Sequence, residues 1–174
     1  MSAMQAALAL AQLERLDYLV AARQYIAARY RQVIEEENCP WLIPPLVPAG
    51  LTHSNWTYAC KLDEDRLGAD WREFRKVFLQ YGGDGLYSAW RPLHREPIFQ
   101  TMAFFGSRER SPNFDPRYKG AVKSYNEGDC PVIEELQRRL CLFKTSMQTR
   151  ERVDQQVDAL RTTIRHFALR PVRR

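Results

Sequence analysis

The strongest hydrophobic period in the chain lies near its end and predicts a helix. Thr149 is a suitable N-cap for this helix, because its side-chain oxygen can accept a hydrogen bond from an N–H of the first turn. The apolar positions that follow recur at intervals of four, three, four and three residues, as on one helical face: Val153, Val157, Leu160, Ile164 and Phe167. Such a face must be buried against other elements.

A long helix is also expected at the start, from Ser2 to about Glu36. Ser2 and Gln5 have the spacing of a capping box. Ten of the first thirteen residues are apolar or alanine and cover most sides of the helix, so this part is expected to be buried on several sides. The later part has a single apolar stripe: Leu19, Ala22, Ile26, Tyr30 and Val33.

The middle of the chain alternates between predicted strands and helices. A half-buried strand is expected over 53–62, with Trp56, Tyr58, Cys60 and Leu62 on one face and Lys61 on the other. A helix capped by Asp70 follows and stops at Gly82-Gly83. Further strands are expected near 85–90 and 141–144.

Two proline signals frame the remaining segments. The prolines between Pro40 and Pro48 interleave with apolar residues, which predicts an extended strap lying on the domain. Pro131 is placed as the first residue of a helix, with Val132, Ile133, Leu136 and Leu140 as its apolar face. Residues 101–129 are expected to be irregular. Together these elements predict an α/β (α+β) fold in which helices cover one face of a small mixed sheet.

Composition and charge narrow the function classes. The chain has 174 residues, 45% of them hydrophobic and 27% charged, as in one globular domain. Much of the net charge of +5 comes from a C-terminal arginine run, which is either a solvated helix face with a frayed tail or an anion patch: Arg161, Arg165, Arg170, Arg173 and Arg174. Charge alone gives little support for a nucleic-acid binder.

The four cysteines and the hydropathy suggest a cytoplasmic protein. Cysteine spacings match no zinc site, and mostly buried free thiols in a reducing cytoplasm are expected. No apolar run approaches the length of a membrane span, and no signal peptide is evident, so no membrane partner is expected.

One cluster could carry recognition chemistry. Tyr87, Trp90, Arg91 and His94 lie within one stretch, and aromatic rings with arginine can stack a base and bind a phosphate. The alternative is that Tyr87 and Trp90 are core or interface residues. His53, at a strand start, is expected to be a structural hydrogen-bonding residue.

Several motifs, in order along the chain, resemble the DegT/StrS family of sugar aminotransferases, which use pyridoxal phosphate. The opening M-S-x-x-Q-A-A-x-x-x-x-Q-L resembles the segment that follows the cofactor-lysine region. The similarity continues with H-S-x-W-x-Y from His53, G-G-D-G-L-Y-S-A-W from Gly82 and P-L-H-x-x-P-x-F from Pro92. It ends with D-C-P-V from Asp129 and the L-F-K-T run from Leu142.

This resemblance implies the small C-terminal domain of a fold-type I pyridoxal-phosphate-dependent transferase, with a mostly antiparallel sheet. Residues 1–38 would link to a missing large domain, and 39–174 would form the small domain. The family transfers an amino group, commonly from glutamate, to a keto-sugar nucleotide, and the stretch around His94 would border the substrate entrance. The Schiff-base lysine and main phosphate contacts of the family would lie before Met1, so neither catalytic nor cofactor residues are assigned here. The five lysines are poor substitutes: Lys61, Lys76, Lys119, Lys123 and Lys144.

The resemblance leaves two readings of the chain's own role. In the first, the chain is a truncated aminotransferase that neither catalyses nor binds pyridoxal phosphate alone. In the second, it is a non-catalytic interaction module that forms a homodimer, or contacts the missing large domain, through the apolar face of residues 1–20. A basic nucleic-acid binder is a weaker third reading.

Overall fold

The computed structural model describes residues 1–104, 106–107, 117, 125–147 and 149–170. Within it the chain forms two compact units. We call Met1–Tyr87 together with Arg139–Arg174 the main unit, and Ser88–Arg138 the inserted unit. Each is described by itself. Most of the irregular segment predicted over 101–129 lies outside the described residues, as do Lys119, Lys123, Arg173 and Arg174.

The single helix predicted from Ser2 to Glu36 is wrong, because two helices occupy that range. Helix α1 (Ala3–Leu13) begins with the predicted capping box, and α2 (Leu16–Glu36) follows after a turn. At the break, the N–H of Arg15 bonds to the carbonyl of Gln12, three residues back instead of four. This tightened turn ends α1 without any glycine or proline, so the residue pattern does not reveal it.

A four-stranded sheet has the order β1-β2-β4-β3. Strands β1 (Leu42–Ile43) and β2 (Thr57–Leu62) are antiparallel, as are β2 and β4 (Leu140–Lys144), in a register that places Cys60 opposite Cys141. Strand β3 (Leu86–Ser88) forms the other edge. Every strand predicted from the sequence is therefore present: β2 and β3 are shorter than expected, β4 begins one residue earlier, and β1 was not predicted.

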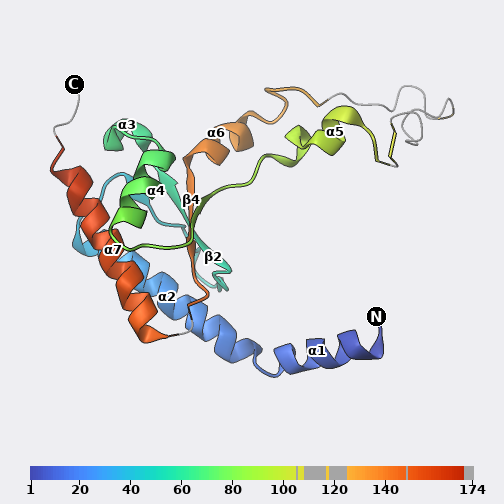
Figure 1. Ribbon diagram of the computed structural model, residues 1–174, viewed down its shortest axis with the longest axis horizontal. Coiled ribbons are helices and arrows are strands. Elements are labelled where there is room, and N and C mark those ends of the chain that lie inside the picture. Colours follow the sequence, from blue (N-terminus) through green and yellow to red (C-terminus); the bar gives the residue numbers. More distant parts are fainter. Residues whose placement is uncertain (105, 108–116, 118–124, 148, 171–174) are drawn as a thin grey trace. The chain divides into compact units, whose positions relative to one another are not determined.

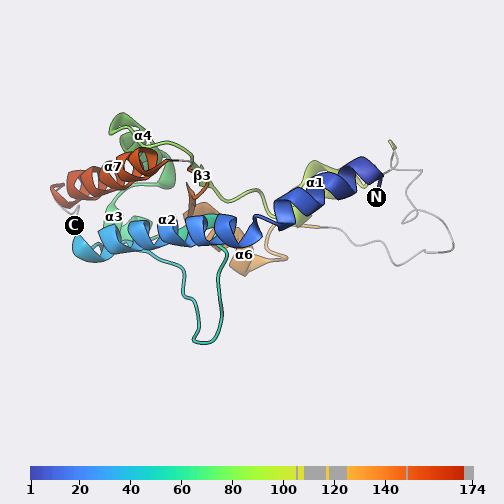
Figure 2. The ribbon, with the colours of Figure 1, turned by 90° about the horizontal axis from the view of Figure 1, so that it is seen from below.

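Helices cover one face of this sheet. Strand β2 buries Tyr58, Cys60 and Leu62 and leaves the alternate residues more exposed. The buried face packs against α2, α4 (Trp71–Gln80) and α7 (Arg150–Ala168), and α2 and α7 lie side by side in both ribbon views (Figure 1 and Figure 2). All five apolar residues predicted for the last helix are buried: Val153, Val157, Leu160, Ile164 and Phe167. The predicted one-sided architecture is confirmed.

Three apolar segments are more exposed than predicted. Helix α1 was expected to be buried on several sides, yet none of its residues is buried. Trp56 was assigned to the buried face of β2, yet it precedes the strand and lies exposed. The proline strap buries Trp41 and Leu42, whereas Leu46 is exposed in the loop that leads away from β1 (Figure 2). Pairing with β2 ends at Ile43, so the chain beyond it has no strand to lie against.

The ends of α4 follow the predicted signals. The Asp70 carboxylate accepts hydrogen bonds from the N–H groups of Arg72 and Glu73. At the other end, Gly82 has a φ of +86° and its N–H bonds to Leu79, while the N–H of Gly83 bonds to Phe78. These two bonds form a Schellman motif.

The described helices of the inserted unit are short, and the last of them ends one residue beyond it. They are η1 (Leu93–Arg95), α5 (Pro97–Thr101) and α6 (Pro131–Arg139), while α3 (Glu64–Leu67) belongs to the main unit. Pro131 begins α6, as predicted. The predicted apolar face is wrong, because Val132 and Ile133 are exposed and Leu140 belongs to β4 instead of the helix. No helix in the described residues has both the length and the apolar character to cross a membrane.

Candidate functional site

The four residues predicted to bind substrate divide between the two units. Tyr87 lies on β3 in the main unit and is exposed. Trp90, Arg91 and His94 belong to the inserted unit, where 76% of Trp90 is exposed. Neither Tyr87 nor Trp90 is therefore a core residue. Of the alternative roles considered for them, core or interface, only the interface role remains.

Arg91 borders a hollow of about 620 Å³ in the inserted unit. The hollow lies between the start of α6 and the segment around η1. Its lining is rich in ionisable groups, with equal numbers of arginines and glutamates: Arg91, Pro92, Arg95, Glu127, Pro131, Glu134, Glu135, Gln137 and Arg138.

A hydrogen-bonded cluster anchors one side of this hollow. Nε2 of His94 lies 2.7 Å from Oε1 of Glu134, and the Gly128 N–H donates to both carboxylate oxygens at 2.8 and 3.1 Å. The hydrogen bond from Gly128, followed by that from His94, lowers the pKa of Glu134. An ionised carboxylate only accepts hydrogen bonds, so His94 donates through Nε2. The cluster thus fixes the imidazole.

Backbone conformation and side-chain amides support the cluster. Gly128 has a φ of +93°, a conformation that residues with a Cβ adopt at a steric cost. Nε2 of Gln100 donates to the carbonyls of His94, at 2.7 Å, and Tyr125, at 2.8 Å. Nε2 of Gln137 donates to the Ala89 carbonyl at 2.9 Å, which ties the segment leading to Arg91 onto α6.

Ion pairs leave one arginine of the hollow available. Arg95 pairs with Glu127 at 3.4 Å, and Arg138 pairs with Glu135 at 2.8 Å. Arg91 has no hydrogen-bond or ion-pair partner within the described part of the chain. A guanidinium offers a planar fork of donors that suits carboxylate or phosphate oxygens, so Arg91 is the group best placed to bind an anion here.

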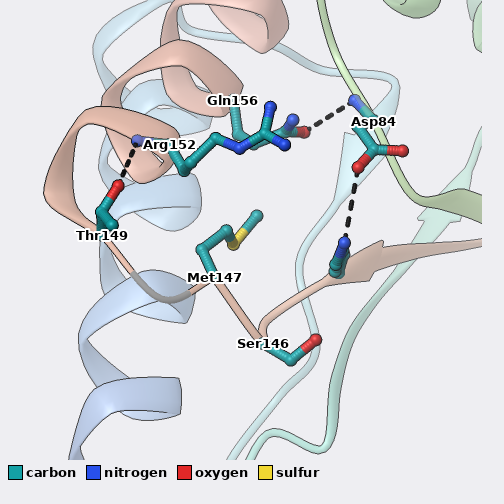
Figure 3. A pocket seen from close by; sticks show the side chains of 7 residues that line it. Asp84, Ser146, Met147, Thr149, Arg152 and Gln156 are labelled. Atoms are coloured by element: carbon teal, nitrogen blue, oxygen red, sulfur yellow. Dashed lines mark hydrogen bonds and ion pairs between the residues drawn. The ribbon is translucent and has the colours of Figure 1, made fainter.

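The main unit contains a second, smaller pocket of about 260 Å³ (Figure 3). It lies where β4 turns into α7, and seven residues line it: Asp84, Lys144, Ser146, Met147, Thr149, Arg152 and Gln156. Nothing in the sequence pattern indicated this pocket, because its residues come from segments about 60 positions apart. Nζ of Lys144 forms an ion pair with Asp84 at 3.4 Å.

The described lysines do not fit a pyridoxal phosphate site. Lys61 points outward from β2, as predicted, and Lys76 is exposed on α4. Lys144 is partly exposed and its carboxylate neighbour, Asp84, is its own ion-pair partner. An imine-forming lysine needs a neutral amine, with a separate acid facing the ring nitrogen of the cofactor. No described lysine has this arrangement.

The C-terminal arginines are largely neutralised. Arg161 bonds to both Glu36 and Glu37, and Arg165 makes two hydrogen bonds to Glu37 at 2.9 and 2.8 Å. Arg170 pairs with Glu73. The described part of the basic run thus joins α7 to α2 and α4, which weakens the case for a nucleic-acid surface. His53 accepts the Asn55 N–H at Nδ1, in the structural role expected.

Comparisons with known proteins agree with the motifs. The profile of the DegT/DnrJ/EryC1/StrS aminotransferase family matches residues 1–123. The chain is 32% identical over 117 residues to the spore coat polysaccharide biosynthesis protein SpsC of Bacillus subtilis (strain 168). That match covers 67% of this chain and 29% of SpsC.

Solved aminotransferases share the fold at low sequence identity. An aminotransferase from Psychrobacter cryohalolentis superposes with a TM-score of 0.69 at 18% identity, covering 97% of this chain and 40% of that protein. DesV of S. venezuelae gives a TM-score of 0.64 at 19% identity, covering 92% of this chain and 36% of DesV. Helicobacter pylori PseC, an aminotransferase involved in the biosynthesis of pseudoaminic acid, gives a TM-score of 0.60 at 17% identity, covering 93% of this chain and 37% of that protein. The predicted fold class is confirmed, and the chain spans about a third of these relatives.

Proposed function

We propose that this chain, which belongs to the DegT/DnrJ/EryC1/StrS aminotransferase family, forms the small domain of a sugar aminotransferase. The family match over most of the chain supports this function. So does the fold, which it shares with aminotransferases that are about two and a half times its length. The amino transfer itself belongs to the complete enzyme.

The small domain's contribution, in this proposal, is to bind the nucleotide part of a keto-sugar nucleotide. The observation that carries it is the guanidinium of Arg91, which borders the hollow of the inserted unit and has no partner among the residues that the structure describes. Arg91 binds a diphosphate oxygen, and Trp90, an exposed residue of the same unit, stacks on the base. His94 is a positioning residue, because its Nε2 is already bonded to Glu134.

Thymidine diphosphate and uridine diphosphate are suitable probes, followed through tryptophan fluorescence and calorimetry. We expect saturable binding that Arg91→Gln weakens about ten-fold, since a charge-assisted hydrogen bond is worth about 1.5 kcal/mol or more. Arg150→Gln is the matched control, because Arg150 carries the same charge and does not line the hollow. Equal affinity in Arg91→Gln and the parent chain would contradict the assignment.

A second part of the proposal is that the chain alone binds no pyridoxal phosphate. The poor fit of Lys61, Lys76 and Lys144 to the cofactor supports it. Adding the cofactor should produce no aldimine absorbance band, and borohydride should leave the mass of the protein unchanged. A borohydride-stable adduct on any one lysine would refute this part.

The exposure of α1 favours a second candidate function, in which the chain self-associates. No residue of α1 is buried, and its larger apolar side chains are exposed: Met4, Leu8, Leu10 and Leu13. Pairing α1 with a second copy, or with a large domain, would bury them. Sedimentation should reveal a dimer at micromolar concentration that Leu8→Glu weakens, whereas a strict monomer would rule out the homodimer.

The last part of the proposal is that the protein is located in the cytoplasm.

A further inference from the structure

The pocket at the turn between β4 and α7 is rich in hydrogen-bond donors. Lys144 and Arg152 bring two cationic groups to it, and Ser146 and Thr149 bring hydroxyls (Figure 3). Asp84 is the only carboxylate among the lining residues. Thr149 also caps α7, a helix of 19 residues whose N-terminal N–H groups carry partial positive charge.

Gln156 supplies a donor from the core. Only 3% of this residue is exposed, and its Oε1 accepts the N–H of Asp84 at 3.0 Å. That bond determines the orientation of the side-chain amide, because only the oxygen can accept. Nε2 is therefore left with no acceptor in the described part of the chain, although the residue lines the pocket. Nε2 is not sealed off from solvent, unlike the one buried unpartnered atom of the described residues, Oη of Tyr58, so it can donate to a molecule in the pocket.

One of the two cations, Lys144, is held close to the pocket by packing, and the other, Arg152, is unpaired within the described residues. Gly85 has a φ of +64°, and a Cβ built there would lie 2.7 Å from Cδ of Lys144 and 2.8 Å from its Cβ. The stem of Lys144 thus packs directly on the glycine backbone. Arg152 donates its backbone N–H to Thr149 at 3.4 Å, and its guanidinium has no partner among the described residues.

From these groups we infer that the pocket binds the terminal phosphate group of a small anion, either free phosphate or a phosphate monoester. Two cations against one carboxylate favour a dianion, and the amide and hydroxyl donors suit its several oxygens. At ~30 Å³ per water, about 260 Å³ corresponds to roughly nine waters. That space admits a phosphate group but leaves little for a nucleobase. The site lies in the main unit and is independent of the nucleotide assignment to Arg91.

Titration of the full chain with inorganic phosphate and with methyl phosphate tests this inference. Amide NMR shifts and calorimetry should give saturable binding with a Kd of about 1 mM or tighter. Arg152→Gln should weaken it about ten-fold, whereas Arg150→Gln, the same change two residues earlier and outside the pocket, should change it less than about two-fold. The stronger of the two ligands identifies whether the free ion or the ester is preferred.

Asp84→Asn should change the affinity for phosphate in the opposite direction to Arg152→Gln. Removing the one carboxylate should tighten binding about three-fold, while the Asp84 N–H to Gln156 hydrogen bond is kept. This result cannot arise from a variant that simply fails to fold. The inference is overturned if neither ligand saturates up to about ten times the expected Kd. It is also overturned if Arg150→Gln weakens binding as much as Arg152→Gln, or if Asp84→Asn does not tighten it.

Discussion

Replacing Gly83 by alanine would place a methyl group inside the ring of Phe78. A Cβ built at Gly83 lies 2.4 Å from Cε1 and 2.5 Å from Cδ1 and Cζ of that ring. Carbon atoms normally approach to about 3.5–4.0 Å, so the ring or the backbone must move by about 1 Å. Phe78 is fully buried and meets Phe143 edge-on at 5.7 Å, which leaves it little freedom.

The cost of this substitution is expected near the upper end of the range for overpacked cores. Such insertions cost about 1–3 kcal/mol, and we expect about 3 kcal/mol because Phe78 belongs to the buried core and packs against the buried ring of Phe143. For a chain of this length that corresponds to a fall in Tm of about 6–12 °C. The Schellman hydrogen bond from the Gly83 N–H to Phe78 would weaken as well.

Urea and thermal unfolding followed by circular dichroism measure this change. Gly50→Ala is a useful control, because Gly50 has a φ of +81° but nothing within 4 Å of its built Cβ. It should cost only the backbone penalty of about 1 kcal/mol. Phe78→Leu should partly rescue Gly83→Ala, with a coupling of at least about 1 kcal/mol. A Gly83→Ala variant within about 0.5 kcal/mol of the parent would refute the reasoning.

Two further predictions concern buried polar groups. Oη of Tyr58 is the one buried side-chain polar atom without a partner in the described residues, whereas Tyr30 donates to the Lys144 carbonyl at 3.1 Å. Tyr58→Phe should therefore leave the free energy of unfolding in urea unchanged or raise it, whereas Tyr30→Phe should lower it by about 1 kcal/mol. The reverse order would contradict this account. Hydrogen bonds from Arg165 and Arg161 lower the pKa of Glu37 in the folded chain. The carboxylate therefore stabilises the folded state above its unfolded-state pKa, about 4.5. This stabilisation is lost as pH falls through the lower folded-state pKa. Glu37→Gln should cost about 1 kcal/mol at pH 7 and progressively less below about pH 4.5, and a pH-independent difference would argue against the ion pair.

Local signals along the chain were enough to predict most of the elements of the fold. The period of α7, the Asp70 cap and the alternation of Tyr58, Cys60 and Leu62 each depend on neighbours within a few residues. The family could also be recognised, because short motifs occur in the right order. Gly82-Gly83 was correctly predicted as a helix stop, on the ground that a glycine accepts a positive φ.

The two candidate sites depend on contacts between segments far apart in the sequence, and only the tertiary structure decided these contacts. His94 meets Glu134 across 40 positions, and Lys144 meets Asp84 across 60. The turn that separates α1 from α2 has no residue signal, since a single tightened hydrogen bond ends the helix. The sequence by itself determined where most helices and strands form, because their bonds are local or their apolar periods regular. Packing decided which charges are paired and which donors remain available, because that choice depends on what lies opposite each side chain in space.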